Sequence, residues 1–331
     1  MLYYYALLYY NINLKQIKTM KKIHLISTLI GLLAFSTISK ADLKVVTSIK
    51  PIHSLASYIM DGVGSPGLIV DGYNSPHSFQ LKPSHAKMLE QADIIFWIGE
   101  DLENFLEKPL ATIAKKAEKI ELLEIKGIKK LKFRERNIFE EHEGHDDHGH
   151  DAKKEEHDDH DDHGHGEYDP HIWLDPINAK VILNEITEHL IENDSKNAAT
   201  YKSNLAKAKS EIDKLIIDVI TETNTDLSYV VFHDAYQYYE NRFNVNILGA
   251  MTVNPDVMPG AEQIHEIHEV IEHDNVSCIL SEPQFNPDII KSIAKDTSVK
   301  TGVLDPLGAN LKPGKDLYFD LIRNMSASFN C

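Results

Sequence analysis

One stretch of this chain, residues 141–167, cannot contribute to a hydrophobic core. Its only apolar side chain is Ala152, and the other positions are His, Asp, Glu, Lys or Gly. Segments with low hydrophobicity and a high density of like charge stay solvated, because they cannot bury enough apolar surface to offset the loss of chain entropy. We therefore expect a disordered loop here, and the ordered structure must be built from the sequence on either side of it.

The same loop is rich in histidine, a composition typical of weak, multivalent binding of divalent metal ions. Its candidate accessory ligands are His142, His145, His148, His150, His157, His160, His163 and His165. Residues 140–169 hold fourteen Asp or Glu against two Lys, so they contribute −12 to the net charge of −17. Nucleic-acid binding needs a basic surface. The charge therefore excludes nucleic acid as a partner and favours a cation.

On both sides of the loop, short apolar runs alternate with helical patterns. The runs that predict strands are residues 45–47, 68–70, 94–98, 229–232, 246–248, 276–280 and 299–303. The stretches that predict helices are residues 51–60, 83–92, 102–108, 259–273 and 287–296. This alternation is the signature of βα units. The predicted fold class is α/β, with two lobes that each contain a mainly parallel sheet flanked by helices.

A long amphipathic helix is predicted between the two lobes, over residues 195–223. Its apolar positions recur every three or four residues, at Tyr201, Leu205, Ala208, Ile212, Leu215 and Val219. This stretch contains neither Gly nor Pro, so we expect a rigid connection and no large closure motion. The predicted domains are an N-terminal lobe at 42–176 that includes the loop 141–167, a helical connector at 177–224 and a C-terminal lobe at 225–331.

The first 41 residues form a leader. Met20-Lys21-Lys22 precedes an apolar run at 23–35, and Ser39-Lys40-Ala41 follows with small residues at the positions that a signal peptidase reads. We predict a signal peptide at 20–41, export to the periplasm and a mature chain that begins near Asp42. The start codon is Met20 or Met1, and an uncleaved anchor helix is the alternative for the whole leader.

Two cysteines, Cys278 and Cys331, remain after removal of the leader. In an oxidising compartment a lone pair of cysteines generally forms a disulfide. Closing a loop of this length contributes roughly 4 kcal/mol to stability in the chain-entropy model. The alternative is two free buried thiols.

Three histidines outside the loop stand where predicted strands give way to loops or turns. His77 follows the strand at 68–70, His171 follows Asp169-Pro170, and His233 comes directly after the strand at 229–232. Asp305 follows the last predicted strand. Ligands of open parallel sheets bind beyond the carboxyl ends of the strands. These four residues are therefore the candidate metal ligands, with Asp305 ranked below the histidines.

Three neutral imidazoles with an optional carboxylate form a ligand set that suits tetrahedral Zn²⁺ better than Mn²⁺, Mg²⁺ or Ca²⁺. Zn²⁺ is therefore the predicted ligand. A single histidine is more often a hydrogen-bonded structural residue, and Asp before Pro is common in turns. The prediction accordingly depends on the whole set.

The main functional prediction is a binding protein without catalytic activity. Three histidines with an open fourth position also describe catalytic zinc, so a zinc hydrolase is one alternative, although no general base stands out nearby in sequence. A storage or buffering protein based on the His-rich loop is the other. It would bind many zinc ions weakly.

The remaining histidines have simpler explanations. His85 and His189 fit exposed positions on predicted helices. His265 and His268 fit the solvated face of an acidic helix. His53 begins the first predicted helix, where packing or capping explains it.

Four segments of the sequence resemble the periplasmic zinc-binding proteins of high-affinity zinc uptake ABC transporters. They are Phe232-His233-Asp234-Ala235-Tyr236, Asn254-Pro255-Asp256 through Pro259-Gly260-Ala261, Ser281-Glu282-Pro283-Gln284-Phe285 and Leu304-Asp305-Pro306-Leu307-Gly308. The resemblance covers essentially all of the chain after residue 41, including the His-rich loop and the cysteine pair.

The resemblance implies two α/β lobes joined by a long helix, with zinc held in the cleft by His77, His171 and His233. Asp305 matches a carboxylate ligand of related binders, whereas the Glu that often precedes the first histidine is replaced here by Pro76. The fourth ligand is therefore Asp305 or water. Manganese-selective relatives tend to carry a carboxylate in place of His233. The implied partner is a membrane ABC permease with its ATPase, and the protein is expected to act as a monomer.

Overall fold

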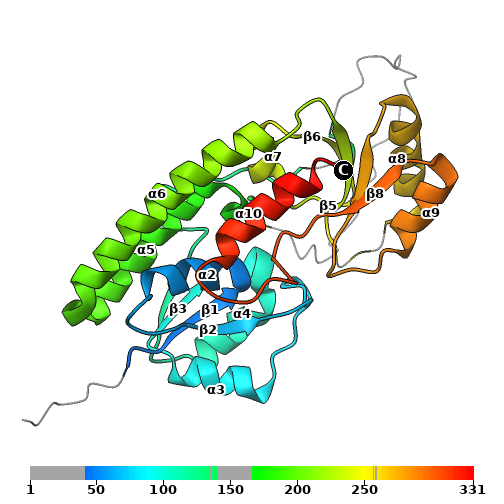
Figure 1. Cartoon of the computed structure of the whole chain (residues 1–331). Helices are drawn as coiled ribbons and strands as arrows, with labels where there is room; N and C mark the ends of the chain where they lie inside the picture. The colour runs from blue at the N-terminus through cyan, green and yellow to red at the C-terminus, as the bar shows by residue number, and fades with distance from the viewer. Residues whose placement is uncertain (1–41, 135, 140–165, 256, 258) are drawn as a thin grey trace, which may run out of the picture. The chain divides into compact units, whose positions relative to one another are not determined.

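The computed structural model describes residues 42–134, 136–139, 166–255, 257 and 259–331 (Figure 1). Residues Leu43–Cys331 form one compact unit. The strands are β1 Val45–Ile49, β2 Gly67–Val70, β3 Ile94–Trp97, β4 Glu118–Glu121, β5 Ser228–His233, β6 Asn246–Thr252, β7 Cys278–Ser281 and β8 Lys300–Val303. The α-helices are α2 Lys50–Ile59, α3 Pro83–Gln91, α4 Glu100–Thr112, α5 Pro176–Asn193, α6 Ala198–Glu222, α7 Gln237–Phe243, α8 Ala261–His273, α9 Asp288–Thr297 and α10 Leu317–Ser328. Two short 3₁₀ helices are η1 Ile172–Leu174 and η2 Ser195–Asn197.

The strands form two four-stranded sheets, in the orders β2-β1-β3-β4 and β6-β5-β7-β8. Every pairing between these strands is parallel. The inner strands β1 and β5 are buried along their whole length, as expected for parallel strands that are covered on both faces. The predicted α/β class with two mainly parallel sheets is confirmed.

The helix predicted at 195–223 is present as α6, Ala198–Glu222. Of its predicted apolar positions, Leu205 is partly buried and the other five are buried. Helix α6 packs along α5, and both contact α2, the helix that follows β1 (Figure 1). Helix α10, at the end of the chain, also packs against α6 and α2. The last helix is therefore anchored on helices that precede β5.

An additional segment lies at the β6 edge of the second sheet. Phe139 N donates to Leu248 O and Ala250 N donates to Asn137 O, so this short segment pairs with β6 in the antiparallel direction. Gly249 allows this close approach, because a Cβ atom there would lie 2.7 Å from Asn137 O. The pairing joins residues that precede the His-rich stretch to the second sheet.

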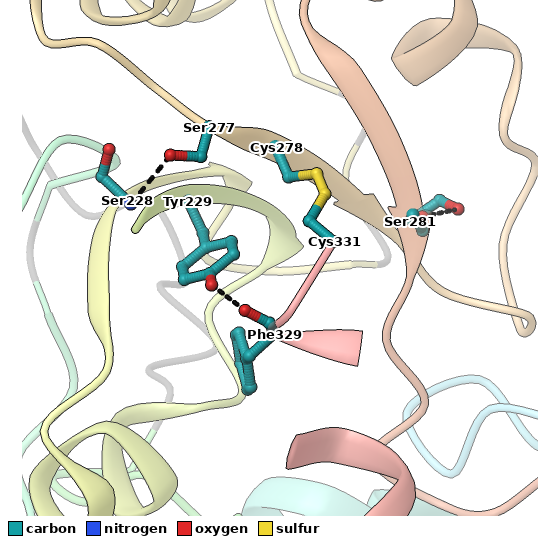
Figure 2. Close-up of a disulfide and its surroundings, with 8 residues drawn as sticks. Ser228, Tyr229, Ser277, Cys278, Ser281, Phe329 and Cys331 are labelled. Atoms are coloured by element: carbon teal, nitrogen blue, oxygen red, sulfur yellow. Dashed lines mark hydrogen bonds between the residues drawn. A yellow bond between two sulfur atoms is a disulfide. The ribbon is translucent and has the colours of Figure 1, made fainter. Parts of the chain in front are cut away.

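The predicted disulfide between Cys278 and Cys331 is present, with the two Cα atoms 6.4 Å apart. Figure 2 shows that it ties the C-terminal residue to the first residue of β7. In the same region, the Tyr229 hydroxyl donates to Phe329 O, and the two rings meet edge to face. Buried contacts thus reinforce the covalent link between the end of the chain and the second sheet.

Strand β4 was not predicted from the sequence. Its residues Glu118–Glu121 read Glu-Lys-Ile-Glu, and only Ile120 is buried. It is an edge strand of the first sheet, where polar side chains reach solvent, so it lacks the apolar pattern of an inner strand. The predicted domain boundaries stay predictions.

The leader prediction at 1–41 lies outside the described residues. So does nearly all of the predicted loop at 141–167, with its eight histidines. Among the residues that the structure does describe, no helix combines the length and apolar character needed to cross a membrane.

Candidate metal centre

The three predicted histidines come from three separate parts of the fold. His77 lies in the loop between β2 and α3, in the N-terminal half of the chain. His171 lies directly before the short helix η1. His233 is the last residue of β5, at the carboxyl end of an inner strand of the second sheet. Only the tertiary fold can bring these residues together.

The structure places the three imidazoles around one point. Their ring centroids are 5.6 Å apart for His77 and His171, 5.6 Å for His77 and His233, and 5.2 Å for His171 and His233. Each ring offers a nitrogen within 4.8 Å of a nitrogen on the other two. The Nε2 atoms of His171 and His233 are only 3.4 Å apart. One ion could contact all three rings.

The cluster is shielded from solvent. The side chains of His171 and His233 are 4% and 3% exposed, and His77 is partly buried. A cavity of about 10 Å³ lies beside the rings, with Trp173 and Phe285 among its lining residues. This is about the space that one water molecule needs. Beside the three rings there is therefore room for one water molecule.

Two of the imidazoles are backed by buried carboxylates. Nδ1 of His171 lies 2.7 Å from Oδ1 of Asp169, and Nδ1 of His233 lies 2.6 Å from Oε1 of Glu282. A carboxylate at Nδ1 favours the tautomer with the proton on that nitrogen, which leaves a lone pair on Nε2. The two Nε2 lone pairs then face each other across 3.4 Å. A cation between them would relieve their repulsion.

Burial and neighbouring charge act differently on these two histidines. Burial holds the pKa of His171 well below its ordinary value, and the nearby His233 lowers it further. Burial also lowers the pKa of His233, but the carboxylates of Glu282, Asp234 and Asp169, with Glu282 foremost, together outweigh it and the net pKa is raised. Burial raises the pKa of Asp169 to about 7. His233 is therefore the histidine of this pair that more readily takes up a proton.

Asp305 does not join the three histidines. Its Oδ1 accepts hydrogen bonds from Leu307 N, Gly308 N and the Gln284 side chain, and its Oδ2 accepts from Ala309 N. In the described part of the chain, the ligand group that contains the three histidines has no fourth member. Asp305 instead caps the backbone of the turn that follows β8.

A buried ionic network lies directly behind His233. The Arg134 guanidinium donates to Asp234 and makes two hydrogen bonds to Glu240. Burial raises the pKa of Asp234 and of Glu240 to about 7. Arg134 supplies the opposite charge that these buried acids need. It also ties the segment that precedes the His-rich stretch to the residue next to His233.

Sequence reasoning missed the roles of Asp169 and Glu282. A signal for Glu282 was available, because it follows β7, the neighbour of β5, just as His233 ends β5. Residues at the ends of adjacent parallel strands lie close together. Asp169 lies two residues before His171 and also accepts from its backbone N–H. That local hydrogen bond leaves no distinctive sequence pattern.

His53 does not take part in the cluster. It is buried, and its Nε2 lies 3.2 Å from Pro66 O. This agrees with the structural role predicted for it.

Comparisons with known proteins identify the family. The family model described as ZnuA, zinc-uptake complex component A, periplasmic, matches residues 45–330. The chain is 45% identical over 303 residues to the high-affinity zinc uptake system protein ZnuA of Brucella abortus (strain 2308), with 86% of this chain and 90% of that protein covered. It is 36% identical over 303 residues to the protein of the same name from Yersinia pestis, with 90% and 94% covered.

Solved structures support the fold. A crystal structure of ZnuA aligns with a TM-score of 0.69 at 21% identity, covering 87% of this chain and 100% of that chain. A mutant of the laminin-binding adhesin of Streptococcus agalactiae aligns with a TM-score of 0.69 at 23% identity, covering 87% and 98%. At such identities these structures are evidence of the fold alone.

Proposed function

Because this chain belongs to the ZnuA family, the periplasmic A components of zinc-uptake complexes, we propose that His77, His171 and His233 hold the zinc ion that it captures. The protein is a high-affinity zinc-binding component of an uptake system. Zinc is its cargo, so the site must bind the ion tightly and also release it. The ligand residues are the part of this function that we propose.

The distance between the Nε2 atoms of His171 and His233 carries the proposal. Zinc binds imidazole nitrogen at about 2.0–2.1 Å with tetrahedral angles, so two such nitrogens lie about 3.3–3.4 Å apart. The observed separation is 3.4 Å. Both rings are held in this position by carboxylates on their far nitrogens. The ligands are therefore preorganised, and little rearrangement has to accompany binding.

The donor set explains the preference for zinc. Three neutral imidazoles suit Zn²⁺, whereas Mg²⁺ and Ca²⁺ prefer oxygen ligands. The carboxylates of Asp169 and Glu282 contact the histidine Nδ1 atoms, where they raise the basicity of the ligands. The same carboxylates offset the charge of the bound ion in a buried site.

We propose that water, and not Asp305, completes the coordination. The Asp305 carboxylate already accepts four hydrogen bonds, three of them from the backbone. Gln284, which donates to Asp305, lines the cavity beside the histidines. That cavity of about 10 Å³ has room for one water molecule. Moving Asp305 onto the metal would leave several backbone N–H groups unsatisfied.

The family assignment favours transport over the two alternatives. Members of the ZnuA family are solute-binding proteins that work with an ABC permease and its ATPase. We infer that this chain delivers zinc to such a permease as a monomer, after export to the periplasm and removal of residues 1–41. A hydrolase would need a base free to activate the zinc-bound water. Here Asp169 and Glu282 are each engaged by a histidine.

X-ray absorption at the zinc edge tests the ligand set. Protein loaded with one equivalent of zinc should show three imidazole nitrogens and one oxygen at about 2.0–2.1 Å. Asp305→Asn should leave this spectrum unchanged, whereas His171→Ala should remove one imidazole. A tightly bound ion with fewer than three imidazoles in the wild-type protein would overturn the assignment.

A further inference from the structure

A second group of metal-ligating side chains lies outside the histidine cluster. Glu118, at the start of β4, and His189 and Glu192, on α5, each offer a ligand atom within 4.8 Å of the other two. The sequence alone suggested only that His189 occupies an exposed helix position. In the structure its side chain is 19% exposed and lies between carboxylates.

The spacing on α5 places several of these ligands on one face. Glu185, His189 and Glu192 are separated by four and three residues, and residues at such intervals lie above one another along a helix. Glu118 approaches the same face from the edge strand of the first sheet. The group thus combines a helical ligand pair with a ligand from another element, which fixes its geometry better than a helix alone.

The imidazole of His189 is held in one orientation. Its Nε2 forms a hydrogen bond of 3.2 Å with Glu185 Oε1, whereas its Nδ1 lies 2.9 Å from Glu118 Oε1 without forming a hydrogen bond. The ring of Phe96 packs against it edge to face, with centroids 6.2 Å apart. Asn193 donates to the other oxygen of Glu118 at 3.0 Å. Both the imidazole and the nearest carboxylate are therefore positioned before any ion arrives.

The charge of the group also favours a cation. Three carboxylates surround one imidazole, and no Lys or Arg of the described chain forms an ion pair with Glu118, Glu185 or Glu192. Their mutual repulsion is relieved by a divalent ion. One imidazole with carboxylates is a harder donor set than three imidazoles, and it binds first-row divalent ions with less preference among them.

We propose that Glu118, His189 and Glu192 form a second, weaker site for a divalent transition-metal ion such as Zn²⁺, with Glu185 able to join. The site lies on the outside of the first sheet, at its β4 edge, and is independent of the proposed cleft ligands. The group is partly exposed, so water competes with its side chains for the ion. It should therefore fill only after the histidine cluster is occupied.

Zinc titration of the full chain tests this site. The eight histidines of 141–167 are replaced by Gln in every sample, so that their weak binding does not mask the result. One further weak ion per chain is expected after the tight site is filled. His189→Gln and Glu192→Gln should each abolish that weak ion and leave the affinity of the tight site unchanged.

His265→Gln is the matched control, because His265 also lies on a helix with a carboxylate four residues away, Glu269, at 3.4 Å. It should retain the weak ion. Anomalous diffraction at the zinc edge, from crystals with excess zinc, should show a peak between His189 and Glu192. An unchanged stoichiometry in both variants, or no peak there once the tight site is saturated, would overturn the proposal. If His77, His171 and His233 were not the tight site, His189→Gln or Glu192→Gln could instead change the affinity of the tightly bound ion.

Discussion

The buried histidine cluster and the Glu118–His189–Glu192 group are two different arrangements of side chains that could hold a metal ion in one fold. In the cluster, three imidazoles come from three distant segments and are almost enclosed by protein. In the second group, one imidazole and one carboxylate share a helix, and only one ligand comes from elsewhere. The histidine cluster therefore has three imidazoles and is mostly buried, whereas the second group has one imidazole and is more exposed.

From this difference we expect the buried cluster to bind zinc more tightly than the exposed group. A buried cluster pays for its desolvation during folding, so an arriving ion meets oriented lone pairs and little competing water. An exposed group keeps water at its ligands and is screened by salt. Preorganisation of the imidazoles by the carboxylates behind His171 and His233 should account for the higher affinity of the cluster.

Removal of one buried imidazole should have the largest effect. His171→Ala should weaken zinc binding by more than about 100-fold. A residue that only supports a ligand typically contributes about 10- to 100-fold to affinity, and loss of the ligand itself should cost more. Competition with a chromophoric zinc chelator measures this. His77→Ala and His233→Ala should behave alike, with His265→Ala as a control at wild-type affinity. Wild-type affinity in all three histidine variants of the cluster would mean that the tight site lies elsewhere.

Replacement of the supporting carboxylates should have the next largest effect. Asp169→Asn and Glu282→Gln should each weaken zinc binding about 10- to 100-fold, because the imidazole loses its orientation and part of its basicity. Glu103→Gln is a matched control. Glu103 is also buried, but it accepts from the backbone N–H groups of Ile98 and Gly99. Equal losses in the control and the test variants would point to a general effect of removing buried charge.

The pH dependence of zinc binding should be set by His233. Its pKa is raised, so protonation begins above the ordinary value of 6.5 as the pH falls. Zinc must displace that proton, and below the pKa the apparent affinity should fall about tenfold per pH unit. His171, with its lowered pKa, stays neutral over the same range.

The variant Glu282→Gln separates this mechanism from general acid unfolding. Loss of the carboxylate removes the contact that raises the pKa of His233. The onset of affinity loss should therefore move to lower pH, even though affinity at high pH is weaker. Chelator competition from pH 5 to pH 8, with circular dichroism as a check on folding, measures the shift. An onset that stays in place would show that another group titrates.

Much of the fold followed from hydrophobic patterning. Inner strands such as β1 and β5 are buried and contain short apolar runs, so the sequence predicts them directly. Edge strand β4 was missed because only one of its four side chains is buried, so it lacks an apolar run. The return of α10 to α2 and α6 depends on contacts between residues far apart in the sequence. Local patterns carry no information about such contacts.

The candidate metal centre also has parts that the sequence predicts and parts that only the tertiary structure reveals. The sequence analysis expected all three histidines beyond strand ends, where ligands of parallel sheets bind, but only His233 ends a strand. His77 lies in the loop after β2, and His171 lies directly before η1. Asp305 and Glu282 both follow strands of the second sheet, yet one caps a turn and the other contacts His233. Composition does not distinguish these roles. A carboxylate after a strand can accept a backbone N–H as readily as a histidine proton, and the loop conformation decides between them.

The smallest effect on tight binding is expected from the His-rich stretch. Replacing its eight histidines by Gln should change the affinity of the tight site by less than about twofold. The three proposed ligands and their supporting carboxylates all lie outside 141–167, so none of the replaced histidines belongs to the proposed site. The number of weakly bound zinc ions should fall sharply.

Isothermal titration of the full chain resolves these two classes of binding. A variant with the same eight positions changed to Asn provides a second neutral background, which guards against an effect peculiar to Gln. If tight binding disappeared in both backgrounds while His171→Ala retained it, the comparison would reverse. The enclosed cluster would then be a structural feature, and the histidines of 141–167 would hold the cargo.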